Sequence, residues 1–428
     1  MKRRFAVCFT VVCVFMLLSI GALHAKKKAP AEKPKIVFWQ NEAGSGLSGW
    51  YKAVIEDINA REGFTVEMVE NPIANVIDLL TAAGVSQSGF DITWDWSGRS
   101  STVLRGKSGL FQPVNALVPE SVLKPLNQGT ITANTDENGN LWGVPFFNDL
   151  NYLVYNKDIL QKAGVDLKKF TNSWDSFIAA CEKVKKAGVV PISFPNKEGI
   201  IHEFWGLDMM YQYFDDEKAL SDYFEKAEFN EPKMKDAMQK YKYLYDKGYL
   251  DPAGETLDYA SNYFSKFSSG QCAFIWFINS MYVSAIKEGR IGEDKAGYAL
   301  HVAYGKGKLA KKVPGLGYCL TVSKWTKHPK EAAKAIEYFV SEKWQAKMLT
   351  DYGVVPAHMN VKVKDAASLT PNMKFYYGDY KGQVTICPYE VLVGFQYDEF
   401  IRSATPYFHG ELSYEDFAKK LKEASKVE

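Results

Sequence analysis

Apolar residues in the first quarter of the chain alternate between the spacing of strands and that of helices. Residues 35–39, 65–69 and 90–94 form short apolar segments typical of buried strands. Residues 49–62 and 75–83 carry apolar side chains at helical spacing. Strands that alternate with helices form parallel sheets covered by helices, so we expect a parallel sheet here.

The remainder of the chain has mainly helical patterns. Helices are predicted at residues 158–164, 172–188, 204–214, 218–227 and 232–247. Strands are predicted at 270–277 and 297–303, a long amphipathic helix at 328–349, and a last helix at 413–424 that opens with the capping sequence Ser413-Tyr-Glu-Asp. A chain of 428 residues is too long for one ordinary core, so we expect two lobes, the second mostly helical.

The segment of residues 141–158, LWGVPFFNDLNYLVYNKD, combines strand patterns with polar and aromatic groups. Its strand pattern stops at Phe147-Asn148-Asp149 and resumes at residues 152–155. Rings beside amides and carboxylates suit a small polyhydroxylated ligand, because a sugar stacks its CH faces on rings and pairs its hydroxyls with polar groups. The alternative is a surface turn between core strands.

Similar residues follow two of the predicted strands. Gln40-Asn41-Glu42 comes after the first strand and Trp94-Asp95-Trp96 after the third. Ligands of parallel sheets bind beyond the carboxyl ends of the strands, so these residues are also candidates for ligand contacts.

The first 25 residues have the pattern of a secretory signal peptide. A basic start, Lys2-Arg3-Arg4, precedes an apolar run at 5–18 and small residues up to Ala25. Residues 26–34 are predicted to be a flexible tether. We therefore expect a protein of the periplasm or cell exterior, with anchoring by an uncleaved leader as the alternative.

Without the three basic residues of the leader, the chain has 49 basic and 50 acidic residues. This balance gives no reason to expect nucleic acid or an anionic membrane as partner.

Metal and cofactor sites are not indicated. The six histidines lack metal-binding spacing, and the four cysteines after the leader (Cys181, Cys272, Cys319 and Cys387) are widely scattered, which favours buried thiols. A GxGxxG motif at 44–49 is separated from its strand by residues 40–43, which argues against a dinucleotide site. Asn138-Gly139 is interpreted as a hairpin turn and not as part of a calcium loop.

Catalysis is harder to exclude. Glu42, Asp95, Asp149 and Glu203 are acids that a glycosidase would use in pairs, but no sequence feature places two of them at catalytic separation. We expect a protein that is not an enzyme and has no catalytic residues. An exported carbohydrate-active enzyme stays as the alternative.

Several motifs in order along the chain resemble one family. They are Ile36-Val-Phe-Trp39, Asp91-Ile-Thr-Trp94-Asp-Trp96, Gly109-Leu-Phe-Gln-Pro113, Gly143-Val-Pro-Phe146, Tyr155-Asn-Lys-Asp158, Phe267-Ser-Ser-Gly270-Gln-Cys-Ala-Phe274, Pro314-Gly315-Leu-Gly317, Gly353-Val-Val-Pro356 and Gly410. With its leader, the chain resembles the family 1 extracellular solute-binding proteins of ABC importers, which include the maltodextrin-binding proteins.

This resemblance implies an α/β, two-lobed periplasmic-binding-protein fold of type II. Each lobe would be a mixed sheet flanked by helices, with hinge crossovers between the lobes, one of them near residues 144–148. The lobes would comprise residues 36–146 with about 300–345, and residues 147–299 with about 346–428.

The resemblance also implies a site and partners. The ligand-binding residues would be Asn41, Glu42, Trp94, Asp95, Trp96, Arg99, Phe147, Asn148, Asp149, Glu203, Trp205, Trp276, Asn279 and Tyr397. Trp276 and Asn279 are assigned where this chain departs from the glycine and tryptophan that usually follow Phe274. The ligand would be a carbohydrate, delivered by a monomer to ABC permease subunits, without a cofactor. A non-sugar solute such as a polyamine is the alternative.

Overall fold

The computed structural model describes residues 33–41, 46–278, 292–363, 369–380 and 382–426. The predicted leader, most of the tether, Glu42 and Asn279 lie outside these residues. The elements described below belong to the compact unit Lys35–Glu428.

The predicted parallel sheet is present at the start of this unit. Strand β1 (Lys35–Gln40) pairs in parallel with both β2 (Thr65–Glu70) and β3 (Ile92–Trp96). Helices α1 (Ser48–Arg61) and α2 (Val76–Ser86) connect these strands. The alternation of strand and helix periods therefore identified all five elements correctly.

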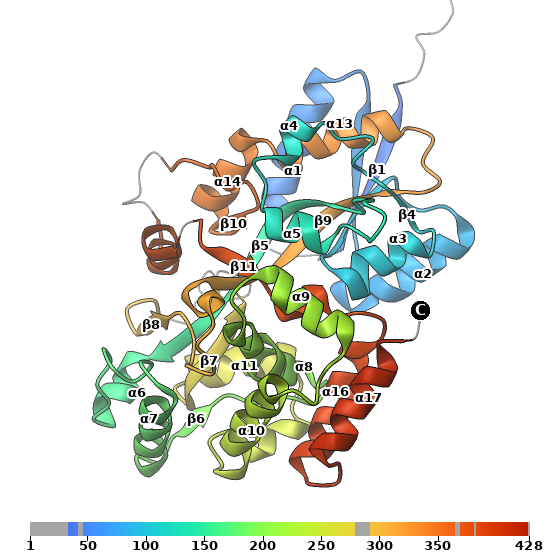
Figure 1. Cartoon of the computed structure of the whole chain (residues 1–428). Coiled ribbons are helices and arrows are strands. Elements are labelled where there is room, and N and C mark those ends of the chain that lie inside the picture. The colour runs from blue at the N-terminus through green and yellow to red at the C-terminus, as the bar shows by residue number, and fades with distance from the viewer. Residues whose placement is uncertain (1–32, 42–45, 279–291, 364–368, 381, 427–428) are drawn as a thin grey trace, which may run out of the picture. The chain divides into compact units, whose positions relative to one another are not determined.

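Two long strands join this sheet to the other half of the molecule. Strand β5 (Val144–Asn156) pairs antiparallel with β9 (Val313–Ser323) over residues 144–150. Over residues 151–156 it pairs with β7 (Cys272–Ile278) and β8 (Ala296–Ala299) instead. One strand thus crosses between two groups of strands, along the path β2-β1-β3-β9-β5-β7-β6 (Figure 1).

The predicted interruption of the strand at residues 147–149 is wrong. All residues of β5 except Asn156 are buried, and the pairing shows only a local irregularity between Pro145 and Phe147. The polar side chains of this segment remain within the strand because other buried residues satisfy them, as described below.

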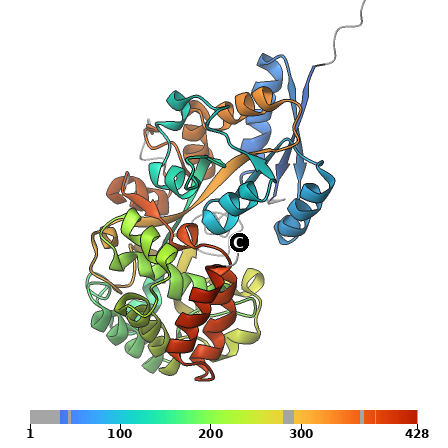
Figure 2. The ribbon, with the colours of Figure 1, turned by 45° about the vertical axis from the view of Figure 1, so that its right-hand side comes forward.

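Helices dominate the second half. They include α6 (Lys157–Lys162), α7 (Trp174–Lys186), α9 (Glu217–Lys226), α10 (Pro232–Asp246), α11 (Tyr259–Ser268), α16 (Gln396–Phe408) and α17 (Tyr414–Ala424), beside the short strand β6 (Val190–Ile192). Helix α16 packs against α17, α10 and α8 (Ile200–His202) (Figure 1, Figure 2). Ser413 caps α17 as predicted, accepting a hydrogen bond from the Asp416 amide at 3.0 Å.

Three predicted elements differ in detail. The long helix at 328–349 is two helices, α13 (Pro329–Phe339) and α14 (Glu342–Tyr352), because the chain is extended at Ser341, and both helices pack on the same core. The helix at 204–214 is a π-helical turn, η3 (Glu203–Leu207), followed by a 3₁₀ segment, η4 (Asp208–Tyr213). The strand predicted at residues 297–303 is shorter, because β8 ends at Ala299.

The turn predicted at Asn138-Gly139 is present. The Asp136 carboxylate accepts hydrogen bonds from the Asn138 and Asn140 amides, both at 2.9 Å. Pairing beside the turn is a single bridge between Thr135 and Leu141, because the preceding residues belong to α5 (Gln128–Ala133).

Short elements complete the described part of the chain. They are η1 (Ile73–Asn75), η2 (Arg99–Val103), α3 (Leu104–Lys107), β4 (Phe111–Gln112), α4 (Glu120–Leu123), η5 (Pro252–Thr256), η6 (Lys308–Lys311), β10 (Val355–Pro356), α15 (Pro371–Lys374), η8 (Phe375–Tyr380), β11 (Val384–Ile386) and η9 (Pro388–Val391).

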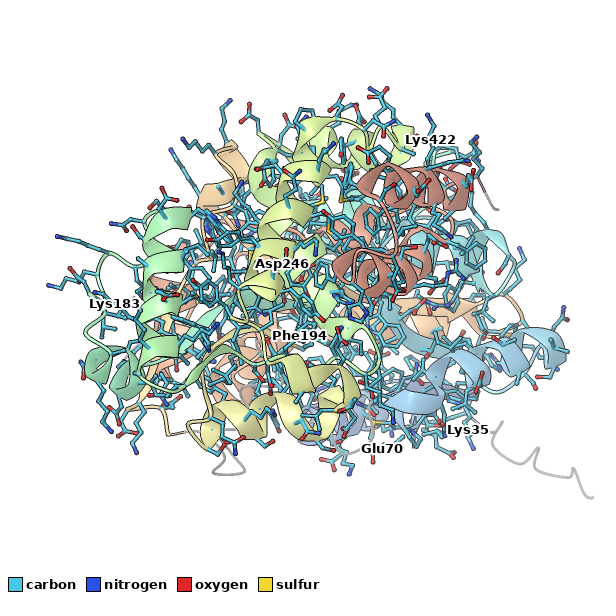
Figure 3. The ribbon with its side chains drawn as sticks, turned by 90° about the horizontal axis from the view of Figure 1, so that it is seen from below. Lys35, Glu70, Lys183, Phe194, Asp246 and Lys422 are labelled. Carbon is cyan, nitrogen blue, oxygen red and sulfur yellow. The ribbon has the colours of Figure 1, made fainter. Side chains whose placement is uncertain are left out.

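Two large hydrophobic cores organise these elements. The first core surrounds β1, β3 and α1 and includes Phe38, Trp50 and Trp94. The second core surrounds β7, α7 and α10 and includes Phe194, which is fully buried while Lys183 and Lys422 are exposed on their helices (Figure 3). Cys181, Cys272, Cys319 and Cys387 are buried thiols, as expected. Within the described residues, no helix is long and apolar enough to cross a bilayer.

Candidate functional site

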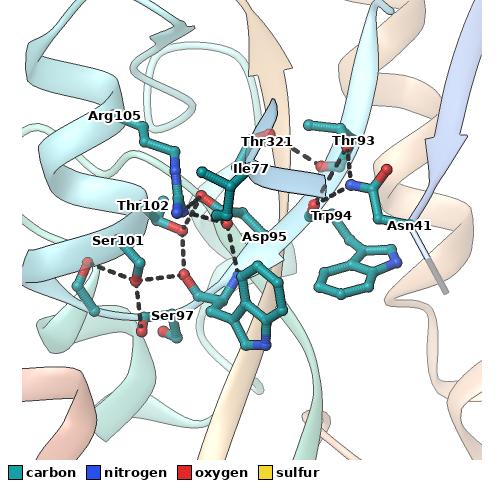
Figure 4. A network of polar contacts seen from close by, with 12 residues as sticks. Asn41, Ile77, Thr93, Trp94, Asp95, Ser97, Ser101, Thr102, Arg105 and Thr321 are labelled. Carbon is teal, nitrogen blue, oxygen red and sulfur yellow. Dashed lines mark hydrogen bonds and ion pairs between the residues drawn. The ribbon is translucent and has the colours of Figure 1, made fainter. Parts of the chain in front are cut away.

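The carboxylate of Asp95, at the end of β3, is satisfied by hydrogen bonds from neighbouring residues of the chain. The side chain is fully buried, and Arg105 Nη1 donates to both carboxylate oxygens, at 2.6 and 2.7 Å. Thr102 Oγ1 donates to Oδ2 at 3.2 Å and the Trp96 amide to Oδ1 at 2.9 Å (Figure 4). These hydrogen bonds satisfy both oxygens of the Asp95 carboxylate, so this side chain stabilises the loop after β3.

Asn41 fixes the neighbouring strand end in a similar way. Its Nδ2 donates to Thr93 Oγ1 at 2.7 Å and to the Trp94 carbonyl at 3.0 Å (Figure 4). Its Oδ1 accepts a hydrogen bond from Asn71 Nδ2 at 3.0 Å. The fully buried amide therefore ties the end of β1 to β3.

Aromatic rings gather beside Asp95. The centroid of the Trp94 ring lies 5.3 Å from that of Trp96 and 5.3 Å from that of Tyr318, both in edge-on geometry. Phe147 stacks on Tyr318 with centroids 4.2 Å apart. Trp94, Trp96, Phe147 and Tyr318, here called the ring cluster, thus come from β3, β5 and β9. Trp94 is buried and its indole N–H has no hydrogen-bond partner in the described structure.

The polar residues of β5 point in two directions. Asn148 Oδ1 accepts a hydrogen bond from Asn127 Nδ2 at 3.0 Å, and its Nδ2 donates to the Pro356 carbonyl at 3.3 Å. Successive strand residues face opposite sides, so Asp149 and Asn151 share the other face. Asn151 Nδ2 donates to Asp208 Oδ2 at 2.6 Å.

Two carboxyl groups lie buried on this second face. Glu203 Oε2 accepts a hydrogen bond from the Tyr397 hydroxyl at 2.6 Å, and Asp208 Oδ1 accepts one from Cys387 Sγ at 2.6 Å. Burial, and then the charge of Asp208, raises the pKa of Glu203 to about 8. Burial also raises the pKa of Asp208 to about 7. The two groups therefore titrate together near neutral pH.

Two tryptophans of the second core lie near these acids. The fully buried indole of Trp276 lies close enough to Asp208 to lower the pKa of that carboxyl, although its N–H is outside hydrogen-bond geometry. Trp205 stacks on Phe177 with centroids 6.3 Å apart, so its ring is part of the second core. Asn151, Glu203, Asp208, Trp276, Cys387 and Tyr397 are called the acid cluster below.

Contacts link the two cores near the acid cluster. Tyr389 packs against the first core, and its ring centroid lies 4.9 Å from that of Tyr397. Arg99, in the loop after β3, forms an ion pair with Glu225 of α9 at 2.6 Å. The acid cluster therefore lies where elements of both cores meet.

The structure unites only some of the predicted site residues. It joins Glu203 with Tyr397, and Trp94 with Trp96 and Phe147. Trp94 lies in the first core and Trp205 in the second, and no described ring contact or hydrogen bond joins either of them to Asn148. Asp149 lies near Tyr259, whose pKa is raised by burial and further by the charge of Asp149.

Sequence reasoning missed Asn151, Asp208, Cys387 and Tyr389. A signal existed for Asn151, because it shares the strand face of Asp149 at a spacing of two. Asp208 carries no such signal, since its place beside Glu203 depends on the π-helical turn η3. Cys387 and Tyr389 come from a distant part of the chain.

A separate surface cavity of about 590 Å³ lies between α1, α4, α13 and α14. Asp57, Tyr338 and Trp344 are among its lining residues, and none of the predicted site residues lines it. Throughout the described part of the chain, no group of His, Cys, Asp and Glu side chains is arranged to hold a metal ion.

Strands that cross between two helix-flanked sheets define an α/β fold of the type II periplasmic-binding-protein class, as predicted. The model of the bacterial extracellular solute-binding protein family matches residues 43–346. The match covers more than half of the chain, which therefore belongs to this family.

Solved structures confirm the fold. A chitin oligosaccharide binding protein superposes with a TM-score of 0.76 at 20% identity, covering 91% of this chain and 98% of that one. The sugar-binding protein MalE from Xanthomonas citri gives a TM-score of 0.71 at 19% identity, covering 91% and 96%.

Similarity to curated proteins is more local. The sn-glycerol-3-phosphate-binding periplasmic protein UgpB of Agrobacterium fabrum is 31% identical over 106 residues, which is 22% of each chain. The matches to the curated relatives thus span well under half of their length, 37% for UgpB of Brucella abortus.

Proposed function

We propose that this protein is the substrate-binding component of an ABC importer, which captures a mono- or oligosaccharide and delivers it to a membrane permease. The observation that carries the proposal is that one face of the crossing strand β5 holds Phe147 of the ring cluster and Asn151 of the acid cluster. The family supports this proposal, as do the names of similar structures that bind sugars.

The chemistry of the two clusters suits a sugar. Carboxyl and amide groups of Glu203, Asp208 and Asn151 pair with hydroxyls, while the half-buried Trp96 offers its ring to the apolar CH groups. A ligand that contacts both cores does so only when they approach each other. Binding would therefore shift the protein toward a closed form by the difference in affinity between the two forms.

The proposal includes the lobe boundaries, the export of the protein, its monomeric state and the absence of catalysis. The lobes would follow the two cores, and because Trp344 and Met348 pack on the first core, we place the boundary after α14. The protein would be an exported monomer that releases its ligand unchanged. Glu203 and Asp208 both lie on one continuous helical segment, η3 followed by η4, which argues against the facing carboxylates that a glycosidase places on either side of a bond.

A phosphate ester is a weaker candidate, although relatives are named for glycerol phosphate. Arg105 is already paired with Asp95, and Arg99 with Glu225. Buried carboxyls beside the ligand would repel a phosphate group.

A thermal-shift screen against sugars tests the proposal, because a ligand that binds only the folded state stabilises it by about 2.7 kcal/mol at a concentration 100-fold above Kd. Trp96→Ala should weaken sugar binding severalfold or more, as a stacking ring contributes about 1 kcal/mol beyond its buried area.

Trp325→Ala is the matched control. Trp325 is also half-buried and packs against the same small core as Trp96, but lies outside both clusters. Equal losses of affinity in the two variants would contradict the site, and a chemically altered sugar after incubation would favour an enzyme.

A further inference from the structure

Glu203 and Asp208 are buried acids with no basic partner in the part of the chain that the structure describes. Glu203 is 6% exposed and Asp208 fully buried. Their hydrogen-bond donors are a phenol, a thiol and an amide, from Tyr397, Cys387 and Asn151. Among the described residues, no Lys, Arg or His forms an ion pair with either acid.

Three other buried acids of the described chain have a basic partner, whereas Glu390, which is fully buried, has none among the described residues. Asp95 is paired with Arg105, and Asp251 with Lys266. Glu399, which is 5% exposed, is paired with both Arg402 and Lys420. Burying a charge is costly unless an opposite charge compensates it, so two interacting buried acids without a base need an explanation.

An unpartnered acceptor beside the pair points to a ligand. Asn151 is 2% exposed; its Nδ2 donates to Asp208, while its Oδ1 has no hydrogen-bond partner in the described structure. A buried acceptor left unsatisfied is costly, and a donor from a bound molecule would recover that cost.

A protonated amine fits these acceptors. An ammonium has three donors and no acceptor, which matches the two carboxyls and the Asn151 amide oxygen. We propose that the solute captured at the acid cluster carries a protonated amine, as an amino sugar does. This inference rests on the proposed function. This ammonium replaces one proton of the carboxyl pair.

The charge balance of binding follows from this exchange. The ligand enters as R–NH₃⁺, and one proton leaves the carboxyl pair for the solvent, so the net charge of the site does not change. Other titratable groups that interact with the pair come from several elements: Tyr211 and Glu390 interact with Asp208, and Tyr259 and Tyr389 with Glu203. Asp149 lies near Tyr259, and the paired Asp95 and Arg105 lie near Tyr389.

Isothermal calorimetry on the full mature chain tests the proposal with matched probes. The pairs are glucose with glucosamine, and N,N′-diacetylchitobiose with its deacetylated form; spermidine serves as an amine without a sugar ring. The amine of each pair is expected to bind at least about tenfold tighter than its neutral partner, because hydrogen bonds between charged groups are roughly twice as strong as neutral ones.

Proton release gives a second measurement that needs no variant. Titrations near pH 7 in buffers of different ionisation enthalpy should show close to one proton released per bound amine, and none for a neutral sugar. Amine binding without proton release would overturn the exchange with the carboxyl pair.

Variants locate the effect. Asp208→Asn and Glu203→Gln should abolish the tenfold preference and the proton release, whereas Glu399→Gln, a buried acid with basic partners, should preserve both. Circular dichroism checks that each variant is folded.

The outcomes separate this inference from the proposed function. Neutral sugars that bind as tightly as their amines would overturn the inference and leave the sugar-binding function intact. Spermidine binding with no response to any sugar would support the charged ligand and refute the sugar. Binding of none of the probes would count against both.

Discussion

The buried ion pair after β3 offers a direct test of how this region is stabilised. Asp95 is fully buried, and both of its oxygens accept hydrogen bonds from Arg105 at 2.6 and 2.7 Å. Arg105→Met keeps much of the side-chain volume but removes the cation. The carboxylate would then remain buried with only Thr102 and the Trp96 amide as donors.

Breaking a buried pair by removing one partner costs about 3–5 kcal/mol. The Arg105 side chain is 21% exposed, so water replaces part of the lost interaction, and we expect a loss near the lower limit, about 3 kcal/mol. With a urea m-value of about 3 kcal/mol/M, the unfolding midpoint should fall by about 1 M.

A double-mutant cycle with Asp95→Asn completes the experiment. The double variant has no unpaired charge and should be more stable than Arg105→Met alone. A loss below about 1 kcal/mol, or strictly additive single losses, would refute the argument that Asp95 depends on Arg105.

Two further predictions concern the junction of the cores. Because the folded-state pKa values of Glu203 and Asp208 are raised, to about 8 and about 7, the folded protein retains protons that the unfolded chain loses. Without ligand, urea unfolding should therefore show stability falling as the pH rises from about 6 to about 8.5, and Asp208→Asn should flatten this slope; an unchanged slope would contradict the burial of the pair. Gly98 has φ +122° and a Cβ there would lie 2.7 Å from the Glu390 backbone. Gly98→Ala should therefore lower the melting temperature more than Gly109→Ala, where φ is +90° but no atom lies within 4 Å; equal shifts would show that the contact yields easily.

Local periodicity predicted most elements but not the way they end or join. The helix at 232–247 follows from its apolar spacing, and α10 spans Pro232–Asp246. The break between α13 and α14 has no comparable local signal, because both halves keep the same amphipathic pattern. It becomes understandable only from the shared core on which Phe339 and Trp344 pack.

The strand β5 shows why the reading of a polar segment depends on tertiary contacts. Phe147-Asn148-Asp149 resembles an interruption because buried strands rarely contain an amide and a carboxylate in sequence. In the structure, Asn127 and the Pro356 carbonyl satisfy Asn148, and these partners are 21 and 208 residues away. No property of the segment itself predicts such partners.

The candidate site illustrates the same limit and its chemical consequence. Glu203 was recognised beside Trp205, but Trp205 is a core ring, and the neighbours that define the chemistry of Glu203 are Asp208 and Tyr397. A sequence shows that an acid is present, whereas its charge state depends on which groups the fold buries beside it. For this chain, the proposed preference for amines rests on the absence of a base beside this acid pair among the described residues.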